Sequence, residues 1–279
     1  MNRKKKRGIM KPKYFTIPYI VWMSVFVVAP IVLVLFYAFT TSSGDITLGN
    51  FGAMGRFLPV FTRSFWLAFI STAVCIIMGY PVAYILSKEG QRAQRLIIML
   101  IMLPMWMNFL LRTYAWMSIL ENTGLLNRLL AAIGLPRLSI INTPAAVVIG
   151  MVYNFLPFMI LPIYSVIVKI DRSLYEAAQD LGGNSLAVFR RLVVPMSLPG
   201  VLSGVMMVFV PAVSTFVISQ LLGGGKVMLL GDLIEMQFLG AAYNPHLGSA
   251  IALVMMVIVT LFMYVMNRFG EGGEMAVGM

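Results

Sequence analysis

The chain has 279 residues, of which 60% are hydrophobic and 11% are charged, and its formal net charge is +11. A soluble domain carries about 25% charged residues, so this composition excludes an ordinary water-soluble protein and favours one embedded in lipid. The single cysteine, Cys75, lies in an apolar segment, which excludes a disulfide framework within the chain and a cysteine metal site.

A basic segment opens the chain, because seven of the 21 Lys and Arg residues precede Tyr14. The apolar run that follows, residues 15–39, is too long for the apolar region of a cleaved signal peptide, and no small-x-small cleavage site follows it. A basic tail directly before a membrane span favours cytoplasmic retention and contact with anionic membrane lipid over nucleic-acid binding. We therefore expect residues 1–14 to form a basic cytoplasmic tail.

Six segments are long and apolar enough to cross a bilayer, which requires about 20 mostly apolar residues. Their approximate bounds are 16–39, 65–86, 96–120, 143–168, 200–222 and 248–267. We therefore expect an all-α integral membrane protein whose six transmembrane helices form one domain over residues 15–268. Fifteen Lys and Arg residues lie on the side of the amino-terminal tail and five on the other, so both ends of the chain, including a tail at 269–279, should be cytoplasmic.

Small residues and prolines occur within the expected spans. Gly200 and Gly204, four apart at the start of the fifth segment, predict close packing against a neighbouring helix. The prolines indicate either ordinary kinks or a bundle that bends between two conformations. They stand at Pro30, Pro81, Pro104, Pro157, Pro162 and Pro211.

The sequence contains none of the common catalytic motifs, such as H-E-x-x-H or G-x-S-x-G. The run Gly223–Lys226 resembles a phosphate-binding loop, but it lacks the first glycine of that motif and has Val227 where the motif needs Ser or Thr. We therefore expect a protein that is not an enzyme and whose own residues bind no cofactor and no metal.

The cytoplasmic loop over residues 169–199 predicts a short helix with defined ends. Ser173 and Glu176, three residues apart, predict a capping box at its start. Gly182 and Gly183 predict its end, because a left-handed residue there costs least without a Cβ. The helix should present one small apolar face, suited to a groove on another protein, formed by Leu174, Ala177, Ala178 and Leu181. Asn184 or Ser185 should then begin a second helix, and Pro195 should end it.

This loop resembles a motif of ABC importer permeases, E-A-A-x-x-x-G-x9-I-x-L-P. The matching residues are Glu176-Ala177-Ala178, Gly182 and Leu192-Val193-Val194-Pro195. In that family the loop is the coupling helix, which sits in a cleft of the ATPase subunit. The resemblance implies the type I ABC importer permease fold, with the ATPase contact made by Glu176, Ala177, Ala178, Gly182, Gly183 and Pro195.

Over about residues 16–268 the chain resembles the PotB-type permeases of spermidine/putrescine importers. The stretches that carry this resemblance are 79–84, 108–114, 156–159 and 174–182. It implies a bacterial inner-membrane complex with an ABC ATPase dimer, a second, different permease subunit and an extracytoplasmic substrate-binding protein. ATP and Mg²⁺ would then be bound by the ATPase, and the permeases would work by alternating access.

A polyamine path needs carboxylates and aromatic faces. Trp106, two residues after Pro104, and Tyr153 offer aromatic rings, and Asp232 and Glu235 would share one face of a short outer helix. Each of these residues also has a plainer interpretation, as a packing aromatic or as part of a solvated acidic turn.

Carboxylates are scarce in the expected spans, which contain none before Glu121, while Arg112 adds a positive charge. Either the second permease supplies the carboxylates, or the imported solute is another one, such as iron(III), sulfate, thiamine or phosphonate. A stand-alone secondary transporter is a further alternative, but it should show internal repeats or acidic chains within the membrane, and the sequence shows neither.

Overall fold

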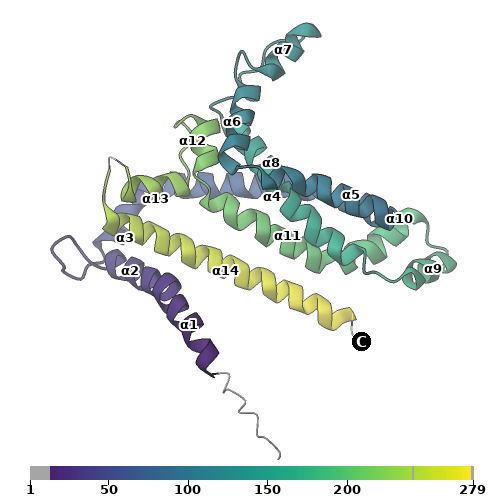
Figure 1. Ribbon diagram of the computed structural model, residues 1–279, viewed down its shortest axis with the longest axis horizontal. Helices are drawn as coiled ribbons and strands as arrows, with labels where there is room; N and C mark the ends of the chain where they lie inside the picture. Colours follow the sequence, from purple (N-terminus) through teal and green to yellow (C-terminus); the bar gives the residue numbers. More distant parts are fainter. Residues whose placement is uncertain (1–12, 241, 278–279) are drawn as a thin grey trace, which may run out of the picture.

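The computed structural model describes residues 13–240 and 242–277. All regular elements in these residues are helices, and the one β-type pairing in them is an isolated bridge between Thr40 and Ile46. Four long helices form the body of the molecule (Figure 1), namely α4 (Leu58–Lys88), α8 (Pro144–Ile167), α11 (Val194–Ser214) and α14 (Pro245–Val277).

Shorter elements flank these four helices, with α9 and α10 at one end of the bundle and α12 and α13 at the other (Figure 1). In chain order they are α1 (Lys13–Met23), η1 (Ser24–Val28), α2 (Ala29–Ala38), α3 (Gly49–Ala53), η2 (Met54–Phe57), α5 (Gln91–Met102), η3 (Leu103–Trp106), α6 (Phe109–Leu120), α7 (Leu125–Ala132), α9 (Arg172–Asp180), α10 (Ser185–Val188), η4 (Phe189–Val193), α12 (Val217–Gly223) and α13 (Leu230–Phe238).

Helix α8 forms the centre of the core and contacts both α4 and α11. Two glycines let α11 approach it closely. A Cβ at Gly200 would lie 2.8 Å from the carbonyl oxygen of Pro162, and one at Gly204 would lie 2.7 Å from the sulfur of Met159. The close packing expected from the spacing of these glycines is therefore confirmed.

Five helices are long and apolar enough to cross a membrane, and a sixth crossing results if the bent pair Gln91–Trp106 and Phe109–Ala132 counts as one span. The six-span architecture therefore agrees with the expectation. The third span does not form one continuous helix over 96–120, because the axis turns by 91° between the two parts. The expectation of a single kinked helix there was wrong.

The bend in the third span has a local cause. Pro104 lies in the 3₁₀ turn η3, which ends in an extended residue, Met107. Asn108 then starts α6 by accepting the backbone N–H of Leu110 on its side-chain oxygen, at 2.8 Å. A proline that cannot donate, followed by a strong N-cap, ends one helix and begins another.

The fifth span is also interrupted, contrary to the continuous segment expected over 200–222. Helix α11 ends at Ser214, Thr215 is extended, and α12 begins at Val217. The start of α13 approaches this break, because a Cβ at Gly231 would lie 2.5 Å from the carbonyl oxygens of both Ser214 and Thr215. Packing from a distant part of the chain thus accompanies an interruption that hydropathy does not reveal.

The first span, Pro18–Ala38, buries none of its apolar window against the rest of the chain. It packs at its carboxyl-terminal end, where Ala38 meets Ala250 and Leu253 of α14. The basic tail before Tyr14 lies almost entirely outside the described residues. At the other end, α14 continues to Val277, well beyond the last span expected at 248–267.

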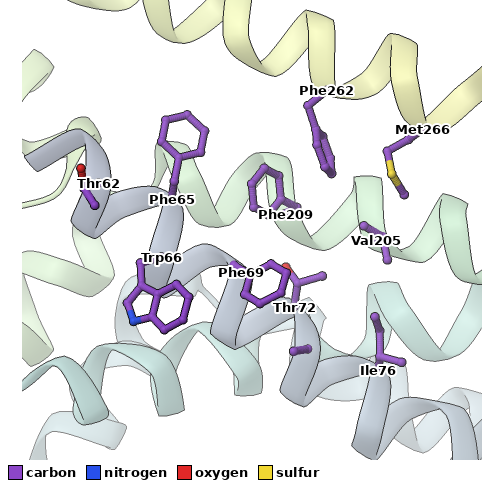
Figure 2. Close-up of a pocket in the computed structure, with 11 residues that line it drawn as sticks. Thr62, Phe65, Trp66, Phe69, Thr72, Ile76, Val205, Phe209, Phe262 and Met266 are labelled. Atoms are coloured by element: carbon purple, nitrogen blue, oxygen red, sulfur yellow. The ribbon is translucent and has the colours of Figure 1, made fainter. Parts of the chain in front are cut away.

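An apolar groove of about 700 Å³ runs between α4, α11 and α14 (Figure 2). Aromatic rings line it, with Phe209 of α11 lying 4.3 Å from Phe262 and 6.2 Å from Phe65, centroid to centroid. Trp66 and Phe69 stack on the α4 side. The groove carries no charged side chain, so it is part of the apolar surface of the bundle.

Candidate functional site

The first helix of the 169–199 loop, α9 (Arg172–Asp180), begins two residues earlier than the expected capping box would place it. Its N-cap is Asp171, whose carboxylate accepts the backbone N–H of Ser173 at 3.1 Å. The expected capping box of Ser173 with Glu176 is therefore wrong, because the side chain of Asp171 already caps the first turn. Glu176 is left exposed on the helix surface.

The end of α9 is a complete Schellman motif. Gly182 has a φ of +80°, and its N–H donates to the carbonyl of Gln179 at 2.8 Å. The N–H of Gly183 donates to the carbonyl of Ala178 at 3.1 Å, and a Cβ at Gly183 would lie 2.5 Å from that same oxygen. The helix stop predicted at these two glycines is confirmed, and each glycine is needed for a different reason.

The apolar face of α9 is largely open to its surroundings. Leu181 is 90% exposed, and Leu174 and Ala177 are also exposed, while Ala178 is half-buried. A hollow of about 270 Å³ lies between the end of α9 and the following helix, lined among others by Ala178, Leu181 and Arg191. Exposed apolar side chains around a hollow on a short, firmly capped helix are typical of a surface that binds another protein.

An aromatic cluster joins this loop to the bundle. The ring of Phe189 meets those of Tyr84 and Tyr80 edge-on, with centroid distances of 4.8 Å and 5.7 Å. The hydroxyl of Tyr80 lies 2.7 Å from that of Ser197 in α11. Burial against the same cluster raises the pKa of the Tyr175 hydroxyl in α9, and the nearby Tyr84 and Tyr80 raise it further. The loop is thus attached to α4 and α11 at once.

Pro195 does not end the second helix, as the sequence suggested. Asn184 caps that helix by accepting the N–H of Ala187 at 2.8 Å, and the helix then continues from Ser185 to Ser214. The π-helical turn η4 lies directly before Pro195, and in it the N–H of Val194 reaches the carbonyl of Phe189. A widened turn beside a proline relieves the clash of the ring with the preceding turn.

The two predicted aromatic path residues have different environments. Trp106 is 80% exposed at the end of η3, beside the bend of the third span. Tyr153 of α8 is half-buried and packs on Trp116 of α6, with ring centroids 5.1 Å apart.

The two predicted path carboxylates also differ. Asp232 is 6% exposed and accepts the N–H of Leu229 at 2.7 Å, so it caps the start of α13. Burial raises the pKa of Asp232 to about 6, although the hydrogen bond from Leu229 acts in the opposite direction. Glu235 is half-buried, and its carboxylate accepts a hydrogen bond from Gln220 at 3.1 Å. In this conformation Glu235 is the more accessible of the two.

No group of three His, Cys, Asp or Glu side chains in residues 13–240 and 242–277 is arranged to hold a metal ion. Sequence reasoning noticed the charge of Arg112 but not its burial. Its side chain is 8% exposed, and its Nε has no hydrogen-bond partner. Hydropathy alone gives no signal for such burial, because it scores the type of each residue and not the packing around it.

The arrangement of helices is that of an ABC importer permease. A bacterial ABC transporter that imports the acidic polysaccharide alginate has a chain that superposes with a TM-score of 0.79, covering 93% of this chain and 94% of that one at 16% identity. A chain of the MetNI methionine ABC transporter gives a TM-score of 0.56, covering 77% of this chain and 95% of that one at 18% identity. At such identities the likeness concerns the fold alone.

The chain belongs to the family of binding-protein-dependent transport system inner membrane components, whose model matches residues 75–271. It is 38% identical to the spermidine/putrescine transport system permease protein PotB of Haemophilus influenzae, over 88% of this chain and 90% of the relative. It is 35% identical to PotB of Escherichia coli, over 88% of this chain and 93% of the relative.

Family membership confirms several expectations. The chain is a multi-pass permease of the bacterial inner membrane and a transport subunit rather than an enzyme. As an ABC importer permease it works together with an ATPase and a substrate-binding protein.

Proposed function

We propose that this chain is the PotB-type permease subunit of a bacterial polyamine importer, acting on spermidine or putrescine. The observation that carries the proposal is 38% identity along nearly the full length of a PotB relative. The motif of the 169–199 loop, whose Gly182 has the expected left-handed conformation, supports the permease part of the proposal.

In this function α9 is the coupling helix and docks into the ATPase dimer with its exposed face. Glu176, Ala177 and Ala178 make the contact, and Gly182 and Gly183 form the helix end that shapes it. Pro195 belongs to the joint between this loop and α11. ATP and Mg²⁺ are bound by the ATPase subunits and not by this chain, and both ends of this chain lie in the cytoplasm.

The transport path lies between this chain and a second, different permease, and an extracytoplasmic binding protein delivers the cargo. On this chain Glu235 and Trp106 face the cargo on the outer side, because they are the most accessible of the predicted path residues. Tyr153 contributes an aromatic ring deeper in the bundle. Asp232 acts mainly by holding the start of α13 beside Glu235.

The experiment that tests the proposal is uptake by the complex of both permeases, the ATPase and the binding protein, reconstituted in proteoliposomes. We expect ATP-dependent uptake of radiolabelled spermidine or putrescine, competed by the unlabelled polyamine. If neither polyamine is taken up, while sulfate, iron(III), thiamine or a phosphonate is, the substrate class is wrong and the permease function stands.

A further inference from the structure

Arg112 in α6 is a nearly buried cation that has no counter-ion among the described residues. Its side chain is 8% exposed, the neighbouring Thr113 is fully buried, and its Nε is buried without a hydrogen-bond partner. Within the described residues, no carboxylate lies within salt-bridge distance of its guanidinium. A charge held away from water costs several kcal/mol unless a partner compensates it, so this guanidinium, whose Nε is buried and unpaired, favours an acidic partner outside the described residues.

The carboxylates considered as partners within this chain are either distant from Arg112 or already hydrogen-bonded. Glu121 follows the end of α6, nine residues beyond Arg112, which corresponds to roughly 14 Å along a helix axis. Asp232 caps α13 through Leu229, and Glu235 accepts from Gln220.

The surface beside Arg112 has the composition of a protein interface. Figure 1 shows α6 and α7 projecting away from the four long helices. Large apolar side chains are exposed along the bend and the first turns of α6, namely Trp106, Met107, Leu110, Leu111 and Tyr114. Aromatic residues, methionine and arginine are the types enriched in interface cores and binding hot spots.

We propose that Arg112 pairs with a carboxylate of the second permease subunit, and that residues 106–114 form part of the interface around that pair. The inference rests on the proposed function, since it requires a second permease. A planar guanidinium binds a carboxylate through two parallel hydrogen bonds, which gives such a pair both energy and a fixed geometry. A path for a polycation also needs carboxylates, and the spans of this chain do not supply them before Glu121.

The test measures how much second permease stays bound when tagged versions of this chain are purified from co-expressing cells in a phospholipid-free maltoside detergent. We expect Arg112→Met to reduce retention by about tenfold or more, the loss that follows when one partner of a buried charge pair is removed. Arg112→Lys should retain an intermediate amount, because it keeps the charge without the planar fork. Arg128→Met is the matched control, since Arg128 is exposed on α7 and should give wild-type retention.

A charge reversal identifies the partner. In the Arg112→Glu background, each outer-half Asp and Glu of the second permease is replaced by Arg in turn, and one replacement should restore both retention and uptake. Wild-type retention by Arg112→Met overturns the inference. The inference is also overturned if Arg112→Met retains the second permease normally in detergent and impairs uptake only in phospholipid vesicles, because the partner of Arg112 is then a lipid phosphate. Failure of the wild-type chain to retain any second permease refutes the proposed heteromeric assembly instead.

Discussion

The backbone N–H of Gly183 donates to the carbonyl of Ala178 at 3.1 Å, and this contact closes the exposed end of α9, the proposed coupling helix. The same two residues approach so closely that a Cβ on Gly183 would lie 2.5 Å from the carbonyl oxygen. The shape of the surface offered to the ATPase therefore depends on a position where no side chain fits.

Substitutions at the two glycines should separate conformation from space. Gly182→Val should be strained by about 1–2 kcal/mol at a φ of +80°, whereas Gly182→Asn should be tolerated because asparagine adopts this conformation more easily. Gly183→Ala should also impair the helix end, through contact with Ala178. The measurement is the amount of ATPase that co-purifies with the permease. Equal ATPase retention by Gly182→Val and Gly182→Asn would speak against the left-handed requirement.

Glu176→Lys should abolish uptake while the protein still inserts into the membrane. Glu176 is exposed and makes no side-chain contact that holds α9 together, so the change affects the contact with the ATPase rather than the fold. Substrate-stimulated ATP hydrolysis by the reconstituted complex is the readout. Glu89→Lys, an exposed acidic residue of the preceding cytoplasmic loop, serves as the control and should remain active. Normal stimulation in Glu176→Lys would refute the docking assignment.

The stability of the chain should depend on pH through Asp232. Its pKa is raised from 3.8 to about 6, so the folded protein binds the proton more tightly than the unfolded chain does. This group therefore contributes stability that is complete below about pH 4 and is lost as the pH rises through about 6. Asp232→Asn stays neutral and can still accept the N–H of Leu229.

The Tm of Asp232→Asn minus that of the wild type should consequently become more positive between about pH 4 and pH 7. Thermal unfolding in detergent measures it, with Glu235→Gln as the companion variant. A Tm difference that stays constant or falls over this range contradicts the raised pKa of the buried carboxyl group.

Two variants test the proposed cargo contacts. Glu235→Gln should raise the apparent KM for spermidine, because it removes a carboxylate that could bind an ammonium group, and Trp106→Leu should lower the maximal rate. Trp66→Leu is a matched control, since Trp66 is also exposed but lies in the apolar groove. Uptake at normal rates in both test variants removes these residues from the path and leaves the family assignment intact.

The orientation of the chain can be tested with reporter fusions. Enzymes active only in the cytoplasm should be active when inserted in residues 88–95 and 171–190, and inactive when inserted in residues 122–137. The reason is the excess of Lys and Arg on the side of the amino-terminal tail. Activity on the outer side at 171–190 would exclude ATPase contact through α9.

Composition and hydropathy were sufficient to predict the spans and the fold class, because a segment that lies in lipid must be apolar along its whole length. They did not reveal the break after Ser214, where the residues on both sides are equally apolar, and the proline pattern predicted a kink at Pro104 but not a turn of 91°. The helix stop at Gly182 was predictable from local conformation alone. The start at Asp171 was not, because two adjacent capping signals compete and only the structure shows which one forms.

The different environments of Asp232 and Glu235 could not be predicted, because they depend on contacts between residues that are distant in the sequence. Leu230 donates its N–H to the hydroxyl of Ser64, which is 166 residues away, and this contact helps to place Asp232 in a buried position. No pattern within α13 shows that its first carboxylate is buried while Glu235 stays accessible.

The continuous helical segment from Ser185 to Ser214, which includes the widened turn η4, has a mechanical consequence. Its 30 residues make a rod about 45 Å long that starts beside the coupling helix and ends at Thr215, where the start of α13 fills the break. A tilt of about 10° at the cytoplasmic end would displace the far end by about 8 Å, if the rod pivots at that end. A small nucleotide-driven movement of the ATPase would in this way produce a larger displacement of α13, the short helix that carries Glu235.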